Sequence, residues 1–482
     1  MSRVRAVLKN TVYQGVTRLV GVITGLITFA ILTRYLGPEQ FGGYSTALTY
    51  VGVLAAIADL GMPVLLLRMI ALRRRSDERH IANLNTLRLL SVALVFAIGL
   101  AIAFFLPYNP AIKTGISITC LGFIMVNLTQ YLAVVFQEKL RTHLSGAADS
   151  FGRVLILVIT IIGIHRQASL FWFFWAFVLG SIVSFLGTYL LSRALFKLHF
   201  SFGVRDWRPL LKQALPLMLV SLFSLVYFKV DTLILSLLDS SYVVGVYSAA
   251  YKYIDVFVTI PAIFGGLALP FFARSTAGQD ETRFARQFER SLRLILMAGG
   301  LLAAVTFVES GRFITLFSGP EYTDSILVLR ILSVAILPLF LGSLCSTALI
   351  ARNRSSLVAW LFGTTAIASL VLYITTIQRF SLYGAALSTV LVETSIAAGT
   401  IIALKRSAIV ALRWHVVFGY IASVFALGST LYVANSLPLA ATLACGIAVY
   451  GVLLILFRVV EKEEISHVLR GTKLPDHTAR FE

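Results

Sequence analysis

The sequence predicts an all-α integral membrane protein with about fourteen transmembrane helices and both ends in the cytoplasm. The first observation is composition: 58% of the 482 residues are hydrophobic and 13% are charged, whereas a soluble chain carries about 25% charged residues. The second is that apolar windows of about 20 residues, long enough to cross the hydrocarbon core, recur along the chain. The third is that basic residues gather in alternate connections. Together these exclude a soluble or disordered chain.

The apolar windows give the positions of the predicted helices. Each is long enough to span a bilayer except the fifth, which is short, interrupted by polar residues and extended by a run-in from residue 146. The connections between the windows are too short to hold a soluble domain. The predicted spans are 14–33, 43–67, 89–106, 114–136, 154–164, 170–191, 215–238, 243–272, 292–308, 325–350, 357–377, 383–404, 416–434 and 439–457.

The basic residues set the predicted orientation. With the N-terminus in the cytoplasm, most of the 41 Lys and Arg residues fall in cytoplasmic connections, as expected for short loops. A missed helix would reverse the second half of the chain and destroy this asymmetry. The net charge of +19 is therefore a consequence of topology, and nucleic-acid binding, which concentrates cations on one soluble face, is not expected. The basic residues predicted to face outside are Arg34, Lys113, Arg166, Arg312 and Arg379.

An internal repeat predicts two pseudo-symmetric six-helix bundles. Residues 42–50 (GGYSTALTY) and 245–253 (GVYSAAYKY) share Gly, Tyr, Ser, Ala and Tyr in register. Both stretches open a span that returns to the cytoplasm, so helices 1 to 6 match helices 7 to 12 in orientation. Parallel repeats of this kind are related by an axis along the membrane normal, with a substrate path between them. The predicted domains are an N-lobe at 1–200, a C-lobe at 201–405, helices 13 and 14 at 406–458 and a cytoplasmic tail at 459–482.

No motif predicts a cofactor, a metal site or a catalytic residue. The chain has no glycine-rich phosphate loop and no His-Glu-x-x-His motif, and its seven histidines are scattered without ligand spacing. Cys120, Cys345 and Cys445 lie in apolar stretches, which favours small buried side chains over a disulfide framework. We therefore expect a membrane protein that is not an enzyme.

Ionisable side chains inside the predicted spans are the candidate functional residues, because each is costly in the bilayer unless it is paired or wet. Cations suit an anionic headgroup, and carboxylates suit gating or ion coupling. The candidate substrate-binding residues are Arg18, Lys229, Lys252 and Arg330. The candidate gating or ion-coupling residues are Asp59, Asp231, Asp255 and Glu393.

A simpler explanation exists for several of these residues. Arg18 lies near the cytoplasmic start of helix 1, where a long side chain can snorkel to the headgroups. Lys252 and Asp255 are three residues apart and can neutralise each other on one helix face. Asp59 and Arg68 flank the cytoplasmic end of helix 2, where a structural ion pair or simple surface exposure explains them as well as a gate does. Glu393 can be a hydrogen-bonded structural carboxyl as well as a proton or sodium coupling site.

Four segments of the chain are similar to the motifs of one known family of membrane proteins. Residues 34–68 begin with RYLGPEQFGGY, which is similar to that family's loop into helix 2. Residues 230–253 carry an Asp-Thr pair followed by GVYSAA, which is similar to its second-lobe signature. Residues 316–322 (LFSGPEY) and 382–388 (LYGAALS) look like its later loop-to-helix markers. The chain thus resembles Wzx-type polysaccharide flippases of the multidrug/oligosaccharidyl-lipid/polysaccharide exporter superfamily, and the resemblance covers helices 1 to 12.

The resemblance implies a two-lobed, V-shaped, MATE-like transporter that works by alternating access. It implies that the substrate is an undecaprenyl-diphosphate-linked oligosaccharide, turned from the inner to the outer leaflet of the bacterial cytoplasmic membrane for O-antigen or exopolysaccharide synthesis. A diphosphate needs positive charge and hydrogen-bond donors, which arginine and lysine supply. The implied partners are this polyprenyl diphosphate, membrane lipids, and the polymerase and glycosyltransferases of the same pathway.

Other functions stay open from the sequence. A cation-coupled multidrug antiporter or a lipid II flippase would belong to the same superfamily, although the antiporter would favour an apolar cavity with a key carboxylate and normally has twelve helices. A membrane glycan polymerase or ligase usually needs a large extracytoplasmic loop, and the longest predicted one, 309–324, is small. The sequence does not determine the glycan, the coupling ion, the oligomeric state or the role of helices 13 and 14.

Overall fold

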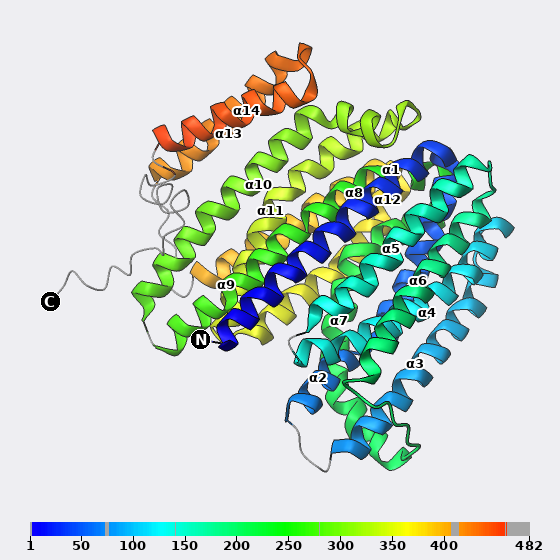
Figure 1. Ribbon diagram of the computed structural model, residues 1–482. Helices are drawn as coiled ribbons and strands as arrows, with labels where there is room; N and C mark the ends of the chain where they lie inside the picture. Colours follow the sequence, from blue (N-terminus) through cyan, green and yellow to red (C-terminus); the bar gives the residue numbers. More distant parts are fainter. Residues whose placement is uncertain are drawn as a thin grey trace. The chain divides into compact units, whose positions relative to one another are not determined.

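The computed structural model describes residues 2–72, 77–139, 141–278, 280–405, 414–457 and 459. All secondary structure formed by these residues is helical (Figure 1). Helices are what apolar runs of this length must form in a bilayer, because lipid cannot satisfy backbone hydrogen bonds and a helix satisfies them within its own segment. The all-α prediction is confirmed.

The helices follow one another with short connections, and two one-turn 3-10 helices lie between them. In chain order the elements are α1 (Ser2–Asp59), α2 (Met62–Leu72), α3 (Asp77–Phe105), α4 (Pro110–Glu138), α5 (Thr142–His165), α6 (Leu170–Arg193), α7 (Val204–Leu238), α8 (Ser241–Phe257), α9 (Thr259–Ala277), α10 (Glu281–Phe317), η1 (Pro320–Tyr322), α11 (Asp324–Ala351), α12 (Ser355–Lys405), α13 (Trp414–Val433), η2 (Ala434–Ser436) and α14 (Leu439–Leu456).

Eleven helical stretches of the described residues are long and apolar enough to cross a membrane. Two of them, Leu19–Ala71 with 53 residues and Ser355–Lys405 with 51 residues, are far longer than the about 20 residues that one crossing needs. Each contains a break with non-helical backbone, at Gly37 and at Ser381. The weak fifth predicted span lies in a candidate span, Thr142–His165. The chain is an integral membrane protein, and the count of fourteen stays a prediction.

One predicted connection is helical instead. The sequence predicted an outside loop over 309–324, but α10 continues to Phe317 and the loop is shorter. Glu309 and Arg312 therefore lie inside the helix, where Glu309 is buried and Arg312 donates a hydrogen bond to Thr442 of α14. Hydropathy falls at charged residues whether or not the helix ends there, so a fall in hydropathy does not by itself mark the start of a loop.

The chain forms two compact units from non-contiguous segments. One unit contains Met1–Ala249, Thr315–Thr323 and Phe362–Ala385, and the other contains Ala250–Ile314, Asp324–Leu361 and Ala386–Glu482. This division follows packing, whereas the predicted lobes at 1–200 and 201–405 follow the sequence repeat. The lobes and their boundaries stay a prediction.

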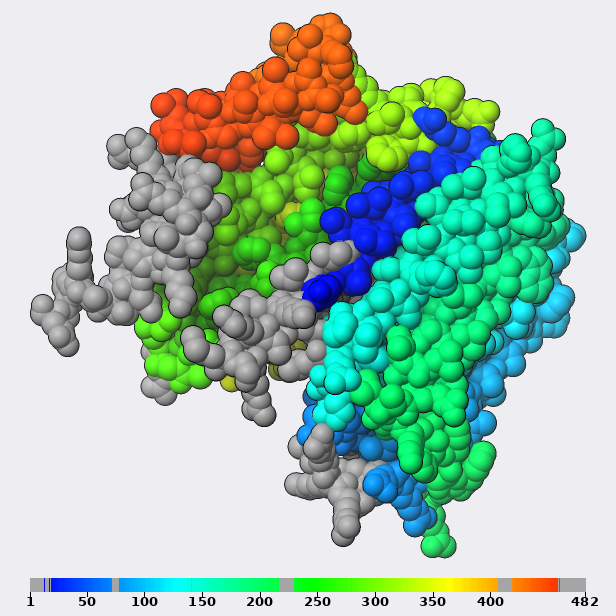
Figure 2. Space-filling view, in the orientation of Figure 1, coloured from blue at the N-terminus to red at the C-terminus, as the bar shows by residue number. Residues whose placement is uncertain are grey.

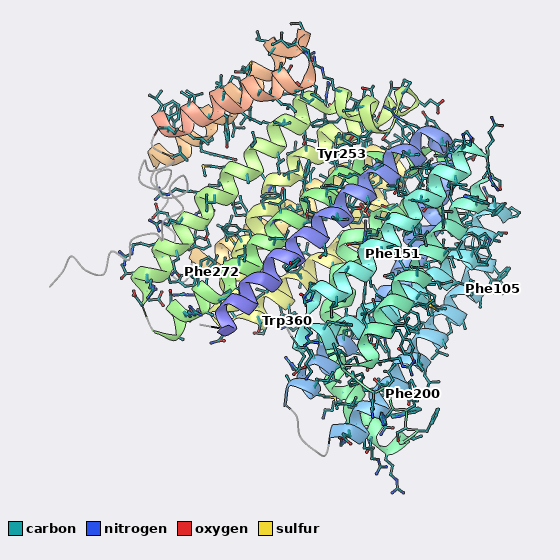
Figure 3. All side chains as sticks on the ribbon, in the orientation of Figure 1. Phe105, Phe151, Phe200, Tyr253, Phe272 and Trp360 are labelled. Carbon is teal, nitrogen blue, oxygen red and sulfur yellow. The ribbon has the colours of Figure 1, made fainter. Side chains whose placement is uncertain are left out.

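In the first unit, small residues let neighbouring helices approach closely. A Cβ atom on Gly152 of α5 would lie 2.5 Å from the carbonyl oxygen of Gly180 of α6, so both positions need glycine. The outer surface of this unit is apolar, as expected for lipid contact. Phe105, which is 90% exposed at the end of α3, lies at the margin of the helices in Figure 3.

In the second unit, α13 and α14 form an antiparallel pair that covers one side of α10 (Figure 2). The two helices meet closely, because a Cβ atom on Gly446 would lie 2.7 Å from the Leu431 side chain. The Tyr450 hydroxyl donates to the carbonyl oxygen of Met297 in α10 at 3.1 Å. The shared apolar cluster contains Val305, Leu427, Leu431, Tyr450, Leu454 and Val459.

A substitution at Gly37 should cost stability. Gly37 has φ 67° and ψ 173°, a region that is essentially open to glycine alone and that costs other residues about 1–3 kcal/mol. We expect Gly37→Ala to lower the thermal unfolding midpoint in detergent. The matched control is Gly25→Ala in the same helix, where a Cβ atom meets nothing within 4 Å and alanine should stabilise by about 0.4–1 kcal/mol. Equal midpoints for the two variants would contradict the prediction.

Candidate functional site

Helices α1 and α8 cross at two glycines that occupy equivalent positions of the sequence repeat. A Cβ atom on Gly42 would lie 1.7 Å from the carbonyl oxygen of Ser241, and one on Gly245 would lie 1.9 Å from the carbonyl oxygen of Pro38. Gly245 follows Gly42 at the same spacing as Ser241 follows Pro38, so the two contacts are related by the repeat. Backbones approach this closely only where side chains are absent. We call this contact the glycine crossing.

Other matched residues of the repeat make equivalent contacts. Ser45 Oγ donates to Ser248 Oγ at 2.7 Å, and the two serines are repeat equivalents of each other. The Tyr50 hydroxyl donates to a backbone carbonyl of α3 at 2.7 Å, and its equivalent Tyr253 donates to a backbone carbonyl of α10 at 2.8 Å. A residue can face its own equivalent only near a two-fold axis. The Ser45–Ser248 pair therefore marks a local pseudo-two-fold axis.

Two Gly-Pro-Glu turns, 37–39 and 319–321, lie against each other close to the glycine crossing. Gly37 has φ 67° and Gly319 has φ 100°, with ψ near 173° in both, so both turns use backbone geometry that favours glycine. Figure 1 shows the end of the first, dark-blue segment of α1 beside the light-green connection that follows α10. The repeated motif thus builds one paired structure, which we call the Gly-Pro-Glu contact.

Polar groups hold the Gly-Pro-Glu contact together. The Arg34 guanidinium donates to the carbonyl oxygens of Thr315 and Leu316. The Tyr322 hydroxyl donates to the carbonyl oxygen of Thr33 at 3.2 Å. Burial and the carboxylate next to it raise the pKa of Tyr322, so its hydroxyl remains a donor at neutral pH. Arg34 was predicted as an outside loop cation, and its structural contacts were not foreseen.

The connections around the glycine crossing are also tied in equivalent ways. The Tyr35 hydroxyl, just beyond the first predicted span, donates to the carbonyl oxygen of Ala168 in the α5–α6 connection at 2.9 Å. The Asp239 carboxylate, after α7, accepts a hydrogen bond from Ser381 at the break of α12. In each half of the repeat, the connection after the first helix is thus bonded to the connection between the fifth and sixth predicted helices.

A buried arginine was missed by the sequence analysis. Arg88 comes directly before the predicted span 89–106 and so falls among the basic residues assigned to cytoplasmic connections, but it lies in α3 and is 1% exposed. Its Nη1 donates to the carbonyl oxygens of Ala58 at 2.9 Å and Asp59 at 3.0 Å. Its Nη2 donates to Asn127 Oδ1 at 2.6 Å and lies 3.3 Å from Asp59 Oδ1. Asp59 is therefore part of an ion pair whose partner is Arg88, not Arg68, the residue that flanks the same helix end in the sequence.

The position of Arg88 follows from the way α1 ends. Leu60 and Gly61 both have positive φ, 49° and 66°, which stops the helix and leaves its last carbonyl groups without helical partners. The Arg88 guanidinium occupies that position from the neighbouring helix. The signal available in the sequence was the polar run Asn-Leu-Asn-Thr at 83–86, one turn before Arg88.

Asp231 is the best-defined of the predicted carboxylates. It is 1% exposed in α7, and its Oδ2 accepts from the Tyr247 hydroxyl at 2.5 Å. Its Oδ1 accepts from the backbone amide of Thr232 at 2.6 Å. Tyr247 belongs to α8 and precedes Ser248, so Asp231 is bonded directly to the helix that forms the glycine crossing.

The remaining candidates are distributed over both units. Lys229 is partly buried on α7 of the first unit, and Lys252 and Asp255 are partly buried on α8 in the second unit. Glu393 is 5% exposed in α12 of the second unit. The meeting of the cations on one path stays a prediction.

Arg330 is exposed on α11, and its Nε donates to Ser310 Oγ of α10 at 3.0 Å. The side chain of Arg18 lies outside the described residues.

Comparison with known proteins identifies the family. Residues 7–276, more than half of the chain, match the family model described as polysaccharide biosynthesis protein. The chain belongs to the polysaccharide biosynthesis protein family. The predicted resemblance to polysaccharide flippases is confirmed at this level.

Named relatives of this family member come from bacteria. The EPS I polysaccharide export inner membrane protein EpsE of Ralstonia solanacearum is 29% identical over 226 residues, which is 45% of this chain and half the length of that protein. A Shigella flexneri protein named as an O-antigen transporter is 23% identical over 80% of this chain and 94% of its own length. Together with the apolar helices, these matches place this family member in a bacterial inner membrane as a multi-pass protein.

Solved structures establish the fold of this family member. The lipid II flippase MurJ in an inward closed conformation has a TM-score of 0.78 at 13% identity, covering 93% of this chain and 99% of that one. An inward-facing MATE family multidrug resistance transporter has a TM-score of 0.65 at 16% identity, covering 81% and 95%. At these identities the comparison shows the fold, which is the MATE-like fold predicted from the sequence.

Proposed function

We propose that this protein flips an undecaprenyl-diphosphate-linked oligosaccharide from the inner to the outer leaflet of the bacterial cytoplasmic membrane. The family match over residues 7–276 carries the proposal. Relatives named for polysaccharide export and O-antigen transport support the substrate class, and the likeness in fold to a lipid flippase supports the reaction. The protein acts as a transporter without covalent chemistry. Its partners are membrane lipids and the polymerase and glycosyltransferases of the same pathway.

The proposed substrate is an anion, which gives the membrane potential a part in transport. An inside-negative potential favours outward movement of negative charge by about 2.3 kcal/mol per charge per 100 mV. Arg18, Lys229, Lys252 and Arg330 would line a basic path for the diphosphate, while the lipid tail remains in the bilayer. Guanidinium and ammonium groups suit this role because they donate several charge-assisted hydrogen bonds to phosphate oxygens.

The proposed carboxylates would act around this path. Asp59 and Asp231 would do so through the partners they already hold, Arg88 and Tyr247. Asp255 and Glu393 remain the proposed residues for gating or ion coupling. The predicted lobes, 1–200 and 201–405, would be the two bodies that move against each other.

The glycine crossing and the Gly-Pro-Glu contact would close the outer side of the path. With the N-terminus in the cytoplasm, the first segment of α1 ends outside, so Thr33 and Gly42 lie near the outer surface. Both contacts join the first helices of the chain to segments of the predicted C-lobe, such as Ser241 and Tyr322. They would have to separate for the oligosaccharide to leave, and re-form for the next cycle.

Removing the four candidate cations tests the basic path. In a strain whose surface glycan depends on this protein, we expect Arg18→Gln, Lys229→Gln, Lys252→Gln and Arg330→Gln together to abolish glycan export while the protein is still made. The matched control changes four exposed cations to Gln, namely Arg68, Arg141, Lys197 and Arg208, and should export normally. Intact export by the first variant would end the basic-path proposal.

The same strain separates the alternative functions. Loss of the gene should leave lipid-linked oligosaccharide on the cytoplasmic leaflet, where an added membrane-impermeant lectin cannot reach it in intact spheroplasts. A multidrug antiporter would instead change drug susceptibility and leave the glycan outside. A polymerase or ligase would leave short glycans on the outer leaflet, and a lipid II flippase would arrest cell-wall synthesis.

A further inference from the structure

Glu309 is a buried carboxylate that the proposed path does not use. It is 1% exposed in α10, and neither of its carboxylate oxygens has a hydrogen-bond partner. The helix ends eight positions further along, at Phe317, about 12 Å away at 1.5 Å per residue. A carboxylate buried in this way is costly unless its charge is balanced or neutralised. The groups around Glu309 therefore decide whether its carboxyl group is ionised or protonated.

Two arginines contact this part of α10. Arg312, one turn further along, has its Nη1 3.5 Å from Glu309 Oε2 and is 28% exposed. The same nitrogen donates to Thr442 Oγ1 in the first turn of α14 at 3.2 Å. From α11, Arg330 donates to Ser310, the residue after Glu309. Arg312 is thus shared between the buried carboxylate and α14.

The other neighbours of Glu309 offer oxygen atoms and aromatic surface. Thr306, one turn earlier and fully buried, has a hydroxyl without a hydrogen-bond partner, and residues three apart are neighbours on a helix face. One turn later, Phe313 is stacked on Tyr253 of α8, with ring centroids 5.9 Å apart. Three buried oxygens without donors therefore lie within one turn, beside an aromatic pair.

A proton fits this arrangement better than a metal ion. Two guanidinium groups repel a metal cation, and one short turn of helix supplies too few oxygen ligands for one. A protonated carboxyl needs no counter-ion and can donate to the Thr306 hydroxyl. It would also let the Arg312 guanidinium remain on Thr442.

We propose that Glu309 is a proton-binding site whose occupancy is controlled by Arg312. With Arg312 at the carboxylate, Glu309 is ionised and paired. When Arg312 stays bonded to α14 and moves away from the carboxylate, Glu309 takes up a proton. This gives α13 and α14 a part in function, because they hold the residue that competes with the proton. Only the role of the bound proton as a coupling ion rests on the proposed transport function.

Carbodiimide labelling tests the site without any transport assay. Dicyclohexylcarbodiimide reacts with protonated carboxyls in apolar surroundings, and the modified residue is found by mass spectrometry of the purified full-length protein in lipid nanodiscs. We expect labelling at Glu309 that falls about tenfold per pH unit above its midpoint. The control is Glu289, on the same helix but 38% exposed and paired with Arg293, which should not be labelled.

Three variants sharpen the result. Glu309→Gln should remove the label from this peptide, and Arg312→Gln should extend labelling to higher pH because the competing cation is gone. Arg312→Lys keeps the charge and should behave like the wild type. Absence of label at Glu309 from acidic to alkaline pH would overturn the proposal. Protection by sodium ions without dependence on pH would also overturn it, since the site would then bind a metal ion.

A separate experiment tests whether the proton at Glu309 is coupled to export. In the glycan-dependent strain, Glu309→Gln should lose the dependence of export on a proton gradient, and Glu289→Gln should retain it. Labelling at Glu309 in a protein that exports no glycan would leave the proton site standing and reject the proposed function. Labelling with gradient-independent export in both wild type and variant would reject the coupling role.

Discussion

Joining position 45 to position 248 through a disulfide should stop export completely. The hydroxyl oxygens of Ser45 and Ser248 are 2.7 Å apart across the glycine crossing, so cysteines at these positions can come within reach of a disulfide. If the crossing must open for the oligosaccharide to leave, a covalent link there traps the protein with its outer side closed. The experiment uses Ser45→Cys with Ser248→Cys in a chain whose own three cysteines are replaced by alanine. Glycan export is measured under oxidising conditions and again after reduction, which should restore it.

The control for this disulfide is a cross-link inside one helix bundle. Ala148 and Gly187 lie on α5 and α6, and a Cβ atom on Gly187 would be 3.1 Å from the Cβ atom of Ala148. A cysteine pair at these positions should also oxidise, but should leave export intact because α5 and α6 move together. Each single cysteine should export under both conditions. Full export by the oxidised double variant Ser45→Cys, Ser248→Cys, with the bond verified by mass spectrometry, would show that the crossing need not open.

Removing the Arg88 side chain should have the largest effect on stability. Arg88 is 1% exposed and donates to two carbonyl groups at the end of α1, to Asn127 and to Asp59. Arg88→Ala leaves those carbonyls and the carboxylate without their donor, and breaking a buried pair on one side costs about 3–5 kcal/mol. We expect a large fall in the thermal unfolding midpoint in detergent. Arg88→Met, which keeps much of the volume, should fall nearly as far, because the lost donor is the cause.

Arg153 provides the matched control for Arg88. It forms an ion pair with Asp149 at 2.9 Å, but both side chains are about half exposed, and exposed pairs of this kind contribute about 0.2–1 kcal/mol. Arg153→Ala should therefore leave the midpoint almost unchanged. Adding Asp59→Asn to Arg88→Met should recover part of the loss, since the unpaired carboxylate is removed. A midpoint for Arg88→Ala equal to that of Arg153→Ala would contradict the capping role.

The short sequence repeat identified residues that make important contacts in the structure. Of its five matched positions, Gly42 and Gly245 form the close crossing, Ser45 and Ser248 bond to each other, and Tyr50 has an equivalent bond to that of Tyr253. What the repeat could not show is that the matched residues meet. Sequence symmetry relates two segments to each other, whereas contact depends on where the axis passes.

For the charged residues, the sequence identified some buried side chains and missed others. Asp231 was selected because carboxylates are costly in a bilayer, and its bond to Tyr247 shows how the cost is met. Arg88 and Glu309 carry the same cost but were assigned to connections, because a charge lowers local hydropathy and makes a helix seem to end. A window average cannot distinguish a charge in water from one that a neighbouring helix buries.

By itself, the sequence determined that the chain is an all-α integral membrane protein and which family it belongs to. These depend on hydropathy and local motifs, which are set by residues near one another in the chain. The tertiary structure alone decided which glycines touch, which carbonyl groups Arg88 caps and which carboxylate Arg312 faces. Those contacts join residues far apart in sequence, and in a bilayer, where all helix surfaces are similarly apolar, only close packing and buried hydrogen bonds select one partner over another.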